Sequence, residues 1–395
     1  MSSRHSLAGL TATAALAYTS YGMCRTPALP LFARHLGASP EMVGLVMAAS
    51  TITGVAVKMP AGALSDAFGR RTLLIAGAAV FAFAPFVYPA VTSLAWLIAL
   101  RFVHGNATAI FGPVASAAVS DLAPADRRGR WLGSYSAVQA AAQGVGAILA
   151  GALIANGRFE RTFIVGGVIG LAALVLASRQ PRTHKAVTGG APWWHRTRDG
   201  LGEVLRDRRL LLVSAAHAGV LLVSGSMAAF MPLFAKETLG LTTLQISGIL
   251  GAQTTAALVA RPVSGAVSDR WGRKVVIVSG LVACSGAFVL VAMAADVVAL
   301  TAAAVMFGAS LAVAAAATSA LVTDVSRRAS YGAAHGVFGT LYDVGDASGP
   351  VVAGLLVAAV GYQQMFLLNG AAAAVIAAAF VAVPLEPLGQ SRRPS

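Results

Sequence analysis

The chain contains twelve apolar segments that are each long enough to cross a lipid bilayer, which takes about 20 residues of α-helix. Only 11% of the residues are charged, against about 25% in a soluble domain, so a water-soluble globule and a disordered chain are both excluded. The sequence predicts an all-α membrane protein with twelve transmembrane helices. The apolar segments cover residues 7–33, 43–64, 72–92, 94–119, 131–155, 162–178, 210–234, 244–267, 275–295, 297–322, 334–359 and 362–384.

The positive charge of the chain predicts its orientation in the membrane. A formal net charge of +14 would suit nucleic-acid binding if the Lys and Arg residues shared one solvated domain, but they lie in short clusters between apolar segments. Most clusters fall on one side of the predicted membrane, and the loops on the opposite side carry only Arg34, Arg158, Arg161 and Lys236. Because cytoplasmic loops are enriched in Lys and Arg, we expect a multi-pass protein of the cell inner membrane with both termini in the cytoplasm.

One long polar stretch, from Arg179 to Arg209, divides the apolar segments six and six. We therefore expect an N-terminal six-helix bundle at residues 1–178, a cytoplasmic linker at 179–209 and a C-terminal six-helix bundle at 210–395.

The two predicted bundles are repeats of each other. Shifting the sequence by 203 residues superimposes glycines, aspartates and other residues of the first half on the same residue types in the second. Parallel repeats of this kind are related by an axis along the membrane normal, and rocking one half against the other exposes a central site to each side in turn. The organisation therefore points to transport. The coinciding pairs include Gly37 and Gly240, Gly69 and Gly272, Gly151 and Gly354, and Phe163 and Phe366.

A short motif occurs at equivalent positions of the two halves. GALSDAFGRR ends at Arg71, between the second and third segments, and GAVSDRWGRK ends at Lys274, between the eighth and ninth. Glycines permit a close helix approach and a tight turn, while an Asp and two cations can form an ionic latch that opens and closes. The predicted cytoplasmic latch comprises Gly62, Asp66, Gly69, Arg70 and Arg71 in the first copy and Gly265, Asp269, Gly272, Arg273 and Lys274 in the second.

Through these two motifs the chain resembles the major facilitator superfamily, whose signature at this loop is G-x-L-x-D-x-x-G-R-[RK]. The resemblance covers nearly the whole chain and implies two pseudo-symmetric six-helix bundles. The twelve-span drug and metabolite exporters of this superfamily are also similar in their first helix, where Pro27 and Pro30 stand three residues apart.

Two further resemblances concern energy coupling. RFVHG, at Arg101–Gly105, is similar to the R-x-x-Q-G pattern of proton-coupled members, with His104 in place of Gln. The Gly-Pro pattern that antiporters carry in the fifth span is only partly present, and a Gly-Pro dipeptide stands in the eleventh span instead. We expect helix-packing roles for Gly144, Gly146, Gly151, Gly349, Pro350 and Gly354.

Several charged residues lie inside predicted spans, where an ionised side chain costs roughly 2.5–3.5 kcal/mol and needs a partner or a watery cavity. Lys58 coincides with Arg261 in the repeat, whereas the others have uncharged counterparts. Charges without a counterpart break the symmetry of the halves, as a directional, ion-coupled cycle requires. The candidates for coupling or substrate binding are Arg25, Arg101, Lys58, Asp343 and Asp346.

The resemblance implies that helix 2 packs against helix 11, and counting residues at 1.5 Å per residue gives Lys58 and Asp343 similar depths. We therefore hypothesise that Lys58 pairs with Asp343 or Asp346. Protonating the aspartate would remove the attraction and bias the halves toward another arrangement. The alternative is a permanent bridge that only holds the halves together.

Arg25 and Arg101 lie in the outer parts of helices 1 and 4, which line the cavity in this family. Either could bind an anionic substrate, and the resemblance implies that Arg101 could tune a proton site. The alternative for both is a side chain that reaches outward to the lipid headgroups. The predicted spans of the first half contain no acidic residue, which makes a bulky organic cation a poorer substrate.

We expect a secondary active transporter that works by alternating access, a proton-coupled exporter of drug-like or small metabolite molecules. The alternatives are a metabolite symporter or uniporter, and a non-transporting receptor or scaffold on a transporter frame. The chain has no G-x-x-x-x-G-K-[ST] loop, and Cys24 and Cys284 lie in apolar segments, so no direct use of ATP, enzymatic activity, cofactor or metal is expected. The expected partners are a small-molecule substrate, protons and the lipid bilayer, without nucleic acid, and the protein is expected to be a monomer.

Overall fold

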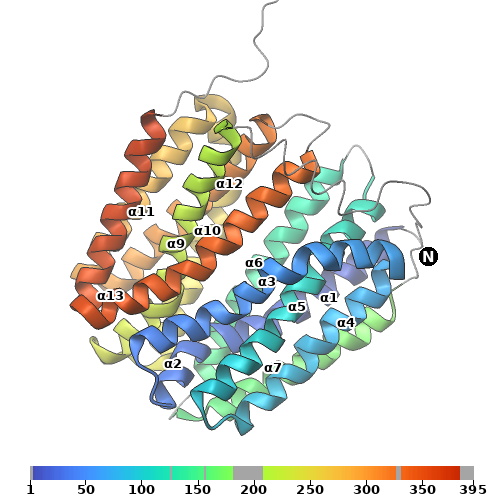
Figure 1. The fold of residues 1–395 in the computed structure, drawn as a ribbon, viewed down its shortest axis with the longest axis horizontal. Coiled ribbons are helices and arrows are strands. Elements are labelled where there is room, and N and C mark those ends of the chain that lie inside the picture. The colour runs from blue at the N-terminus through green and yellow to red at the C-terminus, as the bar shows by residue number, and fades with distance from the viewer. Residues whose placement is uncertain (1–2, 125–126, 155–156, 181–207, 326–330, 383–395) are drawn as a thin grey trace, which may run out of the picture.

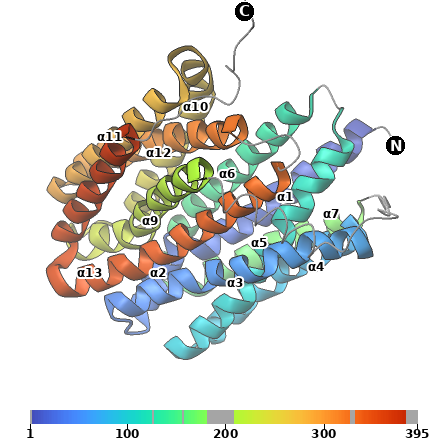
Figure 2. The same ribbon diagram turned by 45° about the horizontal axis from the view of Figure 1, so that its top comes forward.

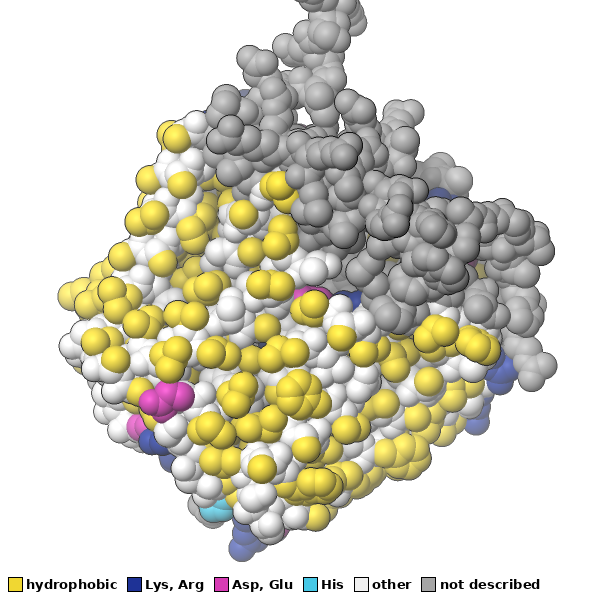
Figure 3. All heavy atoms as spheres, in the orientation of Figure 1, with side chains coloured by type: hydrophobic (Ala, Val, Ile, Leu, Met, Phe, Trp, Pro, Cys, Tyr) yellow, Lys and Arg dark blue, Asp and Glu magenta, His cyan; other side chains and the backbone are white. Residues whose placement is uncertain are grey.

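The computed structural model describes residues 3–124, 127–154, 157–180, 208–325 and 331–382, and every element in these ranges is helical. Residues 181–207 of the predicted linker lie outside the described residues. Large apolar side chains such as Trp271, Met293 and Val298 are exposed, and Figure 3 shows hydrophobic side chains spread over one face of the molecule. An apolar surface of this extent suits lipid rather than water. The chain is a multi-pass membrane protein.

The N bundle holds the six predicted N-terminal spans, two of them in two pieces. The first span is interrupted at Thr26–Pro27, and the third tightens into a 3-10 helix that contains Pro85 and Pro89, because proline removes a backbone donor. Its elements are α1 (Ser3–Arg25), α2 (Ala28–His35), α3 (Pro40–Phe68), α4 (Arg70–Phe83), η1 (Ala84–Ala90), α5 (Leu94–Leu122), α6 (Arg128–Leu153) and α7 (Phe159–Ser178).

The C bundle holds the other six spans. Among the described residues, nine helices are long and apolar enough to cross a membrane, and α1 and α10 are not among these nine. One of the nine, α13, contains two predicted spans, which meet at Gly361, where φ is 84°. These additions account for the twelve predicted spans. The elements are α9 (Arg208–Glu237), α10 (Thr243–Trp271), α11 (Arg273–Met293), α12 (Val297–Val325) and α13 (Tyr331–Ala382).

The repeat found in the sequence is also present in the backbone. Gly37 and Gly240 have φ angles of 82° and 64°, and Gly69 and Gly272 have φ angles of 86° and 89°. Glycine adopts this left-handed region without the steric cost that a side chain brings, so both halves turn at equivalent points. We call the end of the bundles that carries Gly37 and Gly240 the outer side, and the end that carries Gly69 and Gly272 the inner side, following the charge-based prediction.

Two pairs of helices join the bundles. In Figures 1 and 2 the helices α1–α7 and α9–α13 form two neighbouring groups, with α13 lying along α3. The extensive contacts between the groups are those of α3 with α13 and of α6 with α10. The contact of α3 with α13 is the pairing of helix 2 with helix 11 that the family resemblance implies.

The apolar core shows which side of the protein is closed. One buried cluster contains residues of both bundles, including Met23, Phe163, Phe230 and Phe366, near the outer side. Toward the inner side the buried residues separate into one cluster within the N bundle and another within the C bundle. Among the residues whose burial the structure describes, the bundles therefore share a core only near the side that we call outer.

Candidate functional site

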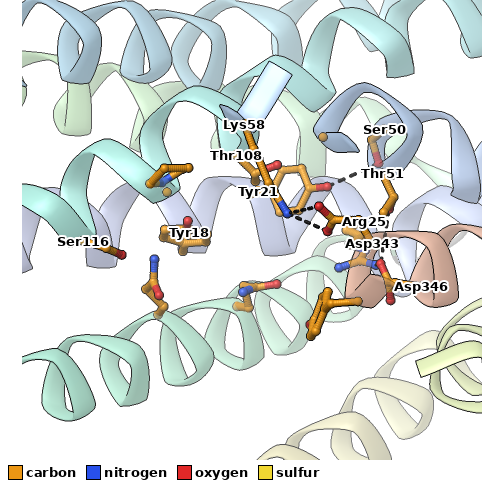
Figure 4. A pocket seen from close by; sticks show the side chains of 16 residues that line it. Tyr18, Tyr21, Arg25, Ser50, Thr51, Lys58, Thr108, Ser116, Asp343 and Asp346 are labelled. Atoms are coloured by element: carbon orange, nitrogen blue, oxygen red, sulfur yellow. Dashed lines mark hydrogen bonds and ion pairs between the residues drawn. The ribbon is translucent and has the colours of Figure 1, made fainter. Parts of the chain in front are cut away.

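A polar cavity of about 420 Å³ lies between the two bundles. The side chains that line it come from α1, α3, α5 and α6 of the N bundle and from α13 of the C bundle, and Figure 4 shows how they surround it. A volume of this size suits a small organic ligand. The polar side chains of the lining are Tyr18, Tyr21, Arg25, Ser50, Thr51, Lys58, Thr108, Ser116, Gln139, Gln143, Tyr342, Asp343 and Asp346.

Lys58 and Asp343 form an ion pair across this cavity, between α3 and α13. The Lys58 Nζ lies 2.6 Å from Asp343 Oδ1 and 2.7 Å from Oδ2, and Figure 4 marks both contacts. The Asp343 side chain is 3% exposed, whereas that of Lys58 is 37% exposed. Of the two partners that the sequence allowed for Lys58, the structure places Asp343 beside it.

Arg25 and Asp346 form a second ion pair between the bundles. Arg25 Nη2 lies 3.2 Å from Asp346 Oδ2, and Thr51 donates a hydrogen bond of 3.2 Å to the same oxygen. This pair joins α1 to α13 one helical turn from the first. Arg25 therefore points into the cavity, and its partner was not predicted from the sequence.

Arg101 lies behind the cavity wall and is fully buried. It donates to the hydroxyl of Tyr88 at 3.2 Å and to that of Ser50 at 2.5 Å, and its guanidinium lies 5.8 Å from the centre of the Tyr21 ring. Among the described residues, no carboxylate forms an ion pair with Arg101. Because its side chain is fully buried and donates to interior hydroxyl groups, it does not reach the lipid headgroups.

His104 lies one turn from Arg101 and belongs to the same cluster. Its Nδ1 lies 2.9 Å from the Tyr88 hydroxyl, and its ring packs edge-on against Tyr21. Neither Tyr88 nor Ser50 was identified from the sequence as a functional residue. Arg101 and His104 are three residues apart and therefore share one face of α5, which indicates a common polar partner.

The two latch copies lie at the inner side. In the second copy Arg273 pairs with Asp269 at 2.7 Å, and Lys274 donates to the carbonyl of Val381 at 2.6 Å. In the first copy Arg70 lies 3.3 Å from Asp121 and also donates to Ser65, while Arg71 donates to the carbonyl of Ser178. Gly62 lies within α3, and the Asp66 side chain lies outside what the structure describes. Gly69, Gly272 and Gly265 lie in the turns or helix ends of these loops.

The predicted packing glycines face other helices at short range. A Cβ on Gly151 would lie 1.5 Å from Ser247 Oγ, and one on Gly144 would lie 2.3 Å from Thr254, so both glycines let α6 approach α10. Gly354 does the same for α13 against Pro40 of α3. Gly146 and Gly349 pack within their own bundles, against α1 and α9, and Pro350 lies between Gly44 and Gly225.

A third ion pair between the bundles closes the outer side. Arg34 Nε lies 2.7 Å from Glu237 Oε1, and Tyr362 donates to Oε2 at 2.8 Å. The hydrogen bond from Arg34 to Glu237 is the main cause of the raised pKa of the guanidinium. The signal for this pair was present in the sequence, since positions 34 and 237 are equivalent in the repeat and carry opposite charges.

The structure has two helical bundles with a charged cavity between them, which is the architecture in which rocking of the halves exposes a central site to each side in turn. The family model of the Major Facilitator Superfamily matches residues 10–252 and 213–395. The chain belongs to this superfamily.

Similar proteins include drug-resistance proteins. The multidrug resistance protein MdtH of Aeromonas hydrophila is 28% identical over 54% of this chain and 52% of its own length. The quinolone resistance protein NorA of Staphylococcus aureus is 21% identical over 38% of this chain and 39% of its own. The matched regions thus span about half or less of these curated relatives. Among solved structures, the nucleoside transporter NupG matches 95% of this chain and 98% of its own with a TM-score of 0.75 at 17% identity, a likeness that concerns the fold.

Proposed function

We propose that this transporter is a proton-coupled secondary active transporter that exports drug-like or small metabolite molecules by alternating access. It acts as a monomer in the inner membrane, with its N bundle at residues 1–178, its linker at 179–209 and C bundle at 210–395, and with both termini in the cytoplasm. The resistance functions in the names of MdtH and NorA support export. The shared core near the outer side supports alternating access, because this core must separate when the outer mouth opens.

The observation that carries the proposal is the Lys58–Asp343 pair. It joins helices of different bundles inside the cavity, and its carboxylate is almost fully buried. Protonation of Asp343 would abolish its attraction to Lys58 and leave a cation that the surroundings no longer compensate. A proton would thereby change the relative free energies of the two arrangements of the bundles, which is what coupling requires.

Proteoliposomes test this proposal. A gradient of norfloxacin, a quinolone, or of uridine, a nucleoside, is imposed while a trapped dye reports the internal pH, because quinolones and nucleosides are the compound classes in the names of NorA and NupG. We expect substrate-driven proton movement in the wild type and at least a tenfold loss in Asp343→Asn. The matched control is Glu160→Gln, which neutralises an exposed carboxylate on α7. Unchanged proton movement in both Asp343→Asn and Asp346→Asn would refute the coupling mechanism.

A second candidate is uptake of a metabolite together with a proton. The observation that favours it is the unequal exposure of the pair: a proton on the covered Asp343 would free the more exposed Lys58 to bind an anion. Substrate accumulation in inverted vesicles supports export, and accumulation in right-side-out vesicles supports uptake.

A further inference from the structure

We propose that the cavity selects organic anions, and that a carboxylate of the ligand binds between Lys58 and Arg25. This inference deepens the second candidate function, uptake of a metabolite together with a proton, because a ligand that binds more tightly when Asp343 is protonated travels with the proton. Its test concerns ligand binding alone.

The charges in and behind the cavity are unequal in number. The lining contributes two cations, Arg25 and Lys58, and two anions, Asp343 and Asp346. Arg101 adds a third cation directly behind the Ser50 and Tyr21 side chains of the wall, and its described hydrogen bonds go to neutral hydroxyl groups. An arginine stays charged at any physiological pH. The described site therefore carries an excess positive charge, which a ligand anion would neutralise.

The exposed fractions of the paired side chains favour an anionic ligand, as the charge count does. Lys58 is 37% exposed and its partner Asp343 only 3%, while Arg25 is 25% exposed and Asp346 is 17%. In each pair the cation has the more exposed side chain. An organic cation would have to displace a lysine or an arginine from its carboxylate, whereas an anion can add to the exposed side of both.

The remaining lining favours a compact ligand with an aromatic ring. Tyr18, Tyr21 and Tyr342 line the cavity, together with the amides of Gln139 and Gln143. Figure 4 places Tyr18 and Ser116 at a distance along the cavity from the ion pairs. A flat organic acid could thus place its carboxylate at the charged end and its ring among the tyrosines.

Protonation of Asp343 would strengthen this binding. The neutral acid no longer competes for Lys58, so a ligand carboxylate can replace it as the counterion. The other titratable or charged groups around Asp343 are Lys58 from α3, Arg25 and Tyr21 from α1, His217 from α9, Arg261 from α10, and Tyr342 and Asp346 from its own helix. Affinity for an anion is therefore expected to rise as the pH falls through the range in which Asp343 takes up its proton.

Three probes of one shape test the selectivity in the purified full-length protein. These are 2-naphthoate, the neutral 2-naphthamide and the cationic 2-naphthylmethylammonium, with binding measured by calorimetry at two pH values. We expect naphthoate to bind at least tenfold more tightly than either analogue, a difference of about 1.4 kcal/mol. We also expect its affinity to be higher at the lower pH. Equal binding of naphthoate and naphthamide, or preferred binding of the cation, would overturn the proposal.

Substitutions separate a binding role of Lys58 from a structural one. Lys58→Gln and Arg25→Gln should each weaken naphthoate binding at least tenfold, and Arg161→Gln, at an exposed position of α7, should leave it unchanged. Because Lys58→Gln leaves Asp343 uncompensated, the double variant Lys58→Gln/Asp343→Asn restores neutrality. If Lys58 binds the anion, the affinity of the double variant for naphthoate stays low. If that affinity returns to the wild-type value, the proposal is wrong.

The outcomes also distinguish this proposal from the proposed function. Tight naphthoate binding without any proton movement in proteoliposomes would refute proton coupling alone. Proton movement driven by naphthylmethylammonium, but not by naphthoate, would refute anion selectivity alone.

Discussion

The two interfaces between the bundles occupy equivalent positions in the repeat but differ in chemistry. The interface of α3 with α13 contains the Lys58–Asp343 pair and lies beside Arg25–Asp346. In the interface of α6 with α10, small and hydroxyl-bearing residues meet, such as Gly144 with Thr254 and Gly151 with Ser247, and no ion pair joins these helices among the described residues. The difference suggests that one interface responds to charge and the other sets the distance between the bundles.

The physics of the two contacts explains why they suit different tasks. A buried ion pair gains Coulomb energy and loses hydration energy in comparable amounts, so one proton can decide whether it forms. A contact between glycine and a neighbouring helix depends steeply on distance, because added atoms overlap outright. A neutral contact of this kind is insensitive to protons. Under the proposed proton coupling, the asymmetry therefore favours α3 and α13 as the helices that respond to the proton.

The largest expected effect is the difference between neutralising Lys58 and neutralising Arg261, the cations at equivalent positions of the two interfaces. Lys58→Gln should lower the transport rate of norfloxacin or uridine at least tenfold, because Asp343 then remains buried without a counterion. Arg261→Gln removes the cation at the equivalent position of α10, where the side chain is exposed, and should change the rate less than twofold. Initial rates in proteoliposomes, at matched protein content, provide the measurement. Similar losses in both variants would mean that the two interfaces share the task.

Much of the fold could be predicted from the sequence because the membrane imposes simple rules. Apolar length gives the spans, and the motif pair ending at Arg71 and Lys274 gives the family. The 203-residue repeat appears again in the positive φ angles of Gly69 and Gly272. The family resemblance, together with a count of residues along the helices, also placed Lys58 near Asp343, since depth in a helix follows from residue number.

The rest of the site depends on the rotation of each helix about its axis, which a depth count leaves open. Arg25 was assigned to an anionic substrate or to headgroups, and its contact with Asp346 requires α1 and α13 to turn particular faces toward each other. Arg101 is surrounded by Tyr88 and Ser50 because η1 and α3 happen to converge there. Contacts among three helices have no local signature in the sequence.

The next largest effect concerns the neutral interface. A Cβ on Gly151 would overlap Ser247 Oγ and lie 2.6 Å from the carbonyl of Thr243, so Gly151→Ala should oppose closure of the outer side. Gly133→Ala lies on the same helix, has nothing within 4 Å of its Cβ, and is the matched control. We expect a transport rate about fivefold lower in Gly151→Ala, a loss of about 1 kcal/mol.

Spin labels on the outer side supply a second measurement for Gly151→Ala. Labels at Arg158 and Thr238, both exposed, report the distance between the bundles. The distribution should shift to longer distances in Gly151→Ala and stay at the wild-type distances in Gly133→Ala. An unshifted distribution in Gly151→Ala would show that α6 and α10 do not set the separation of the outer ends.

The smallest expected effect belongs to the ion pair outside the cavity. Arg34 and Glu237 are both about one-third exposed, and exposed pairs contribute about 0.2–1 kcal/mol. Glu237→Gln should therefore raise the outward-open fraction, measured with the same labels, only about twofold at low salt. At roughly 1 M salt, where the screening length is about 3 Å, the wild type and the variant should converge. The charge-reversed double variant Arg34→Glu/Glu237→Arg should recover the wild-type fraction at low salt. If Glu237→Gln raised the outward-open fraction more than Gly151→Ala does, and did so at every salt concentration, this pair would be the main determinant of outer closure. The contrast between a charged and a neutral interface would then not explain how the outer side closes.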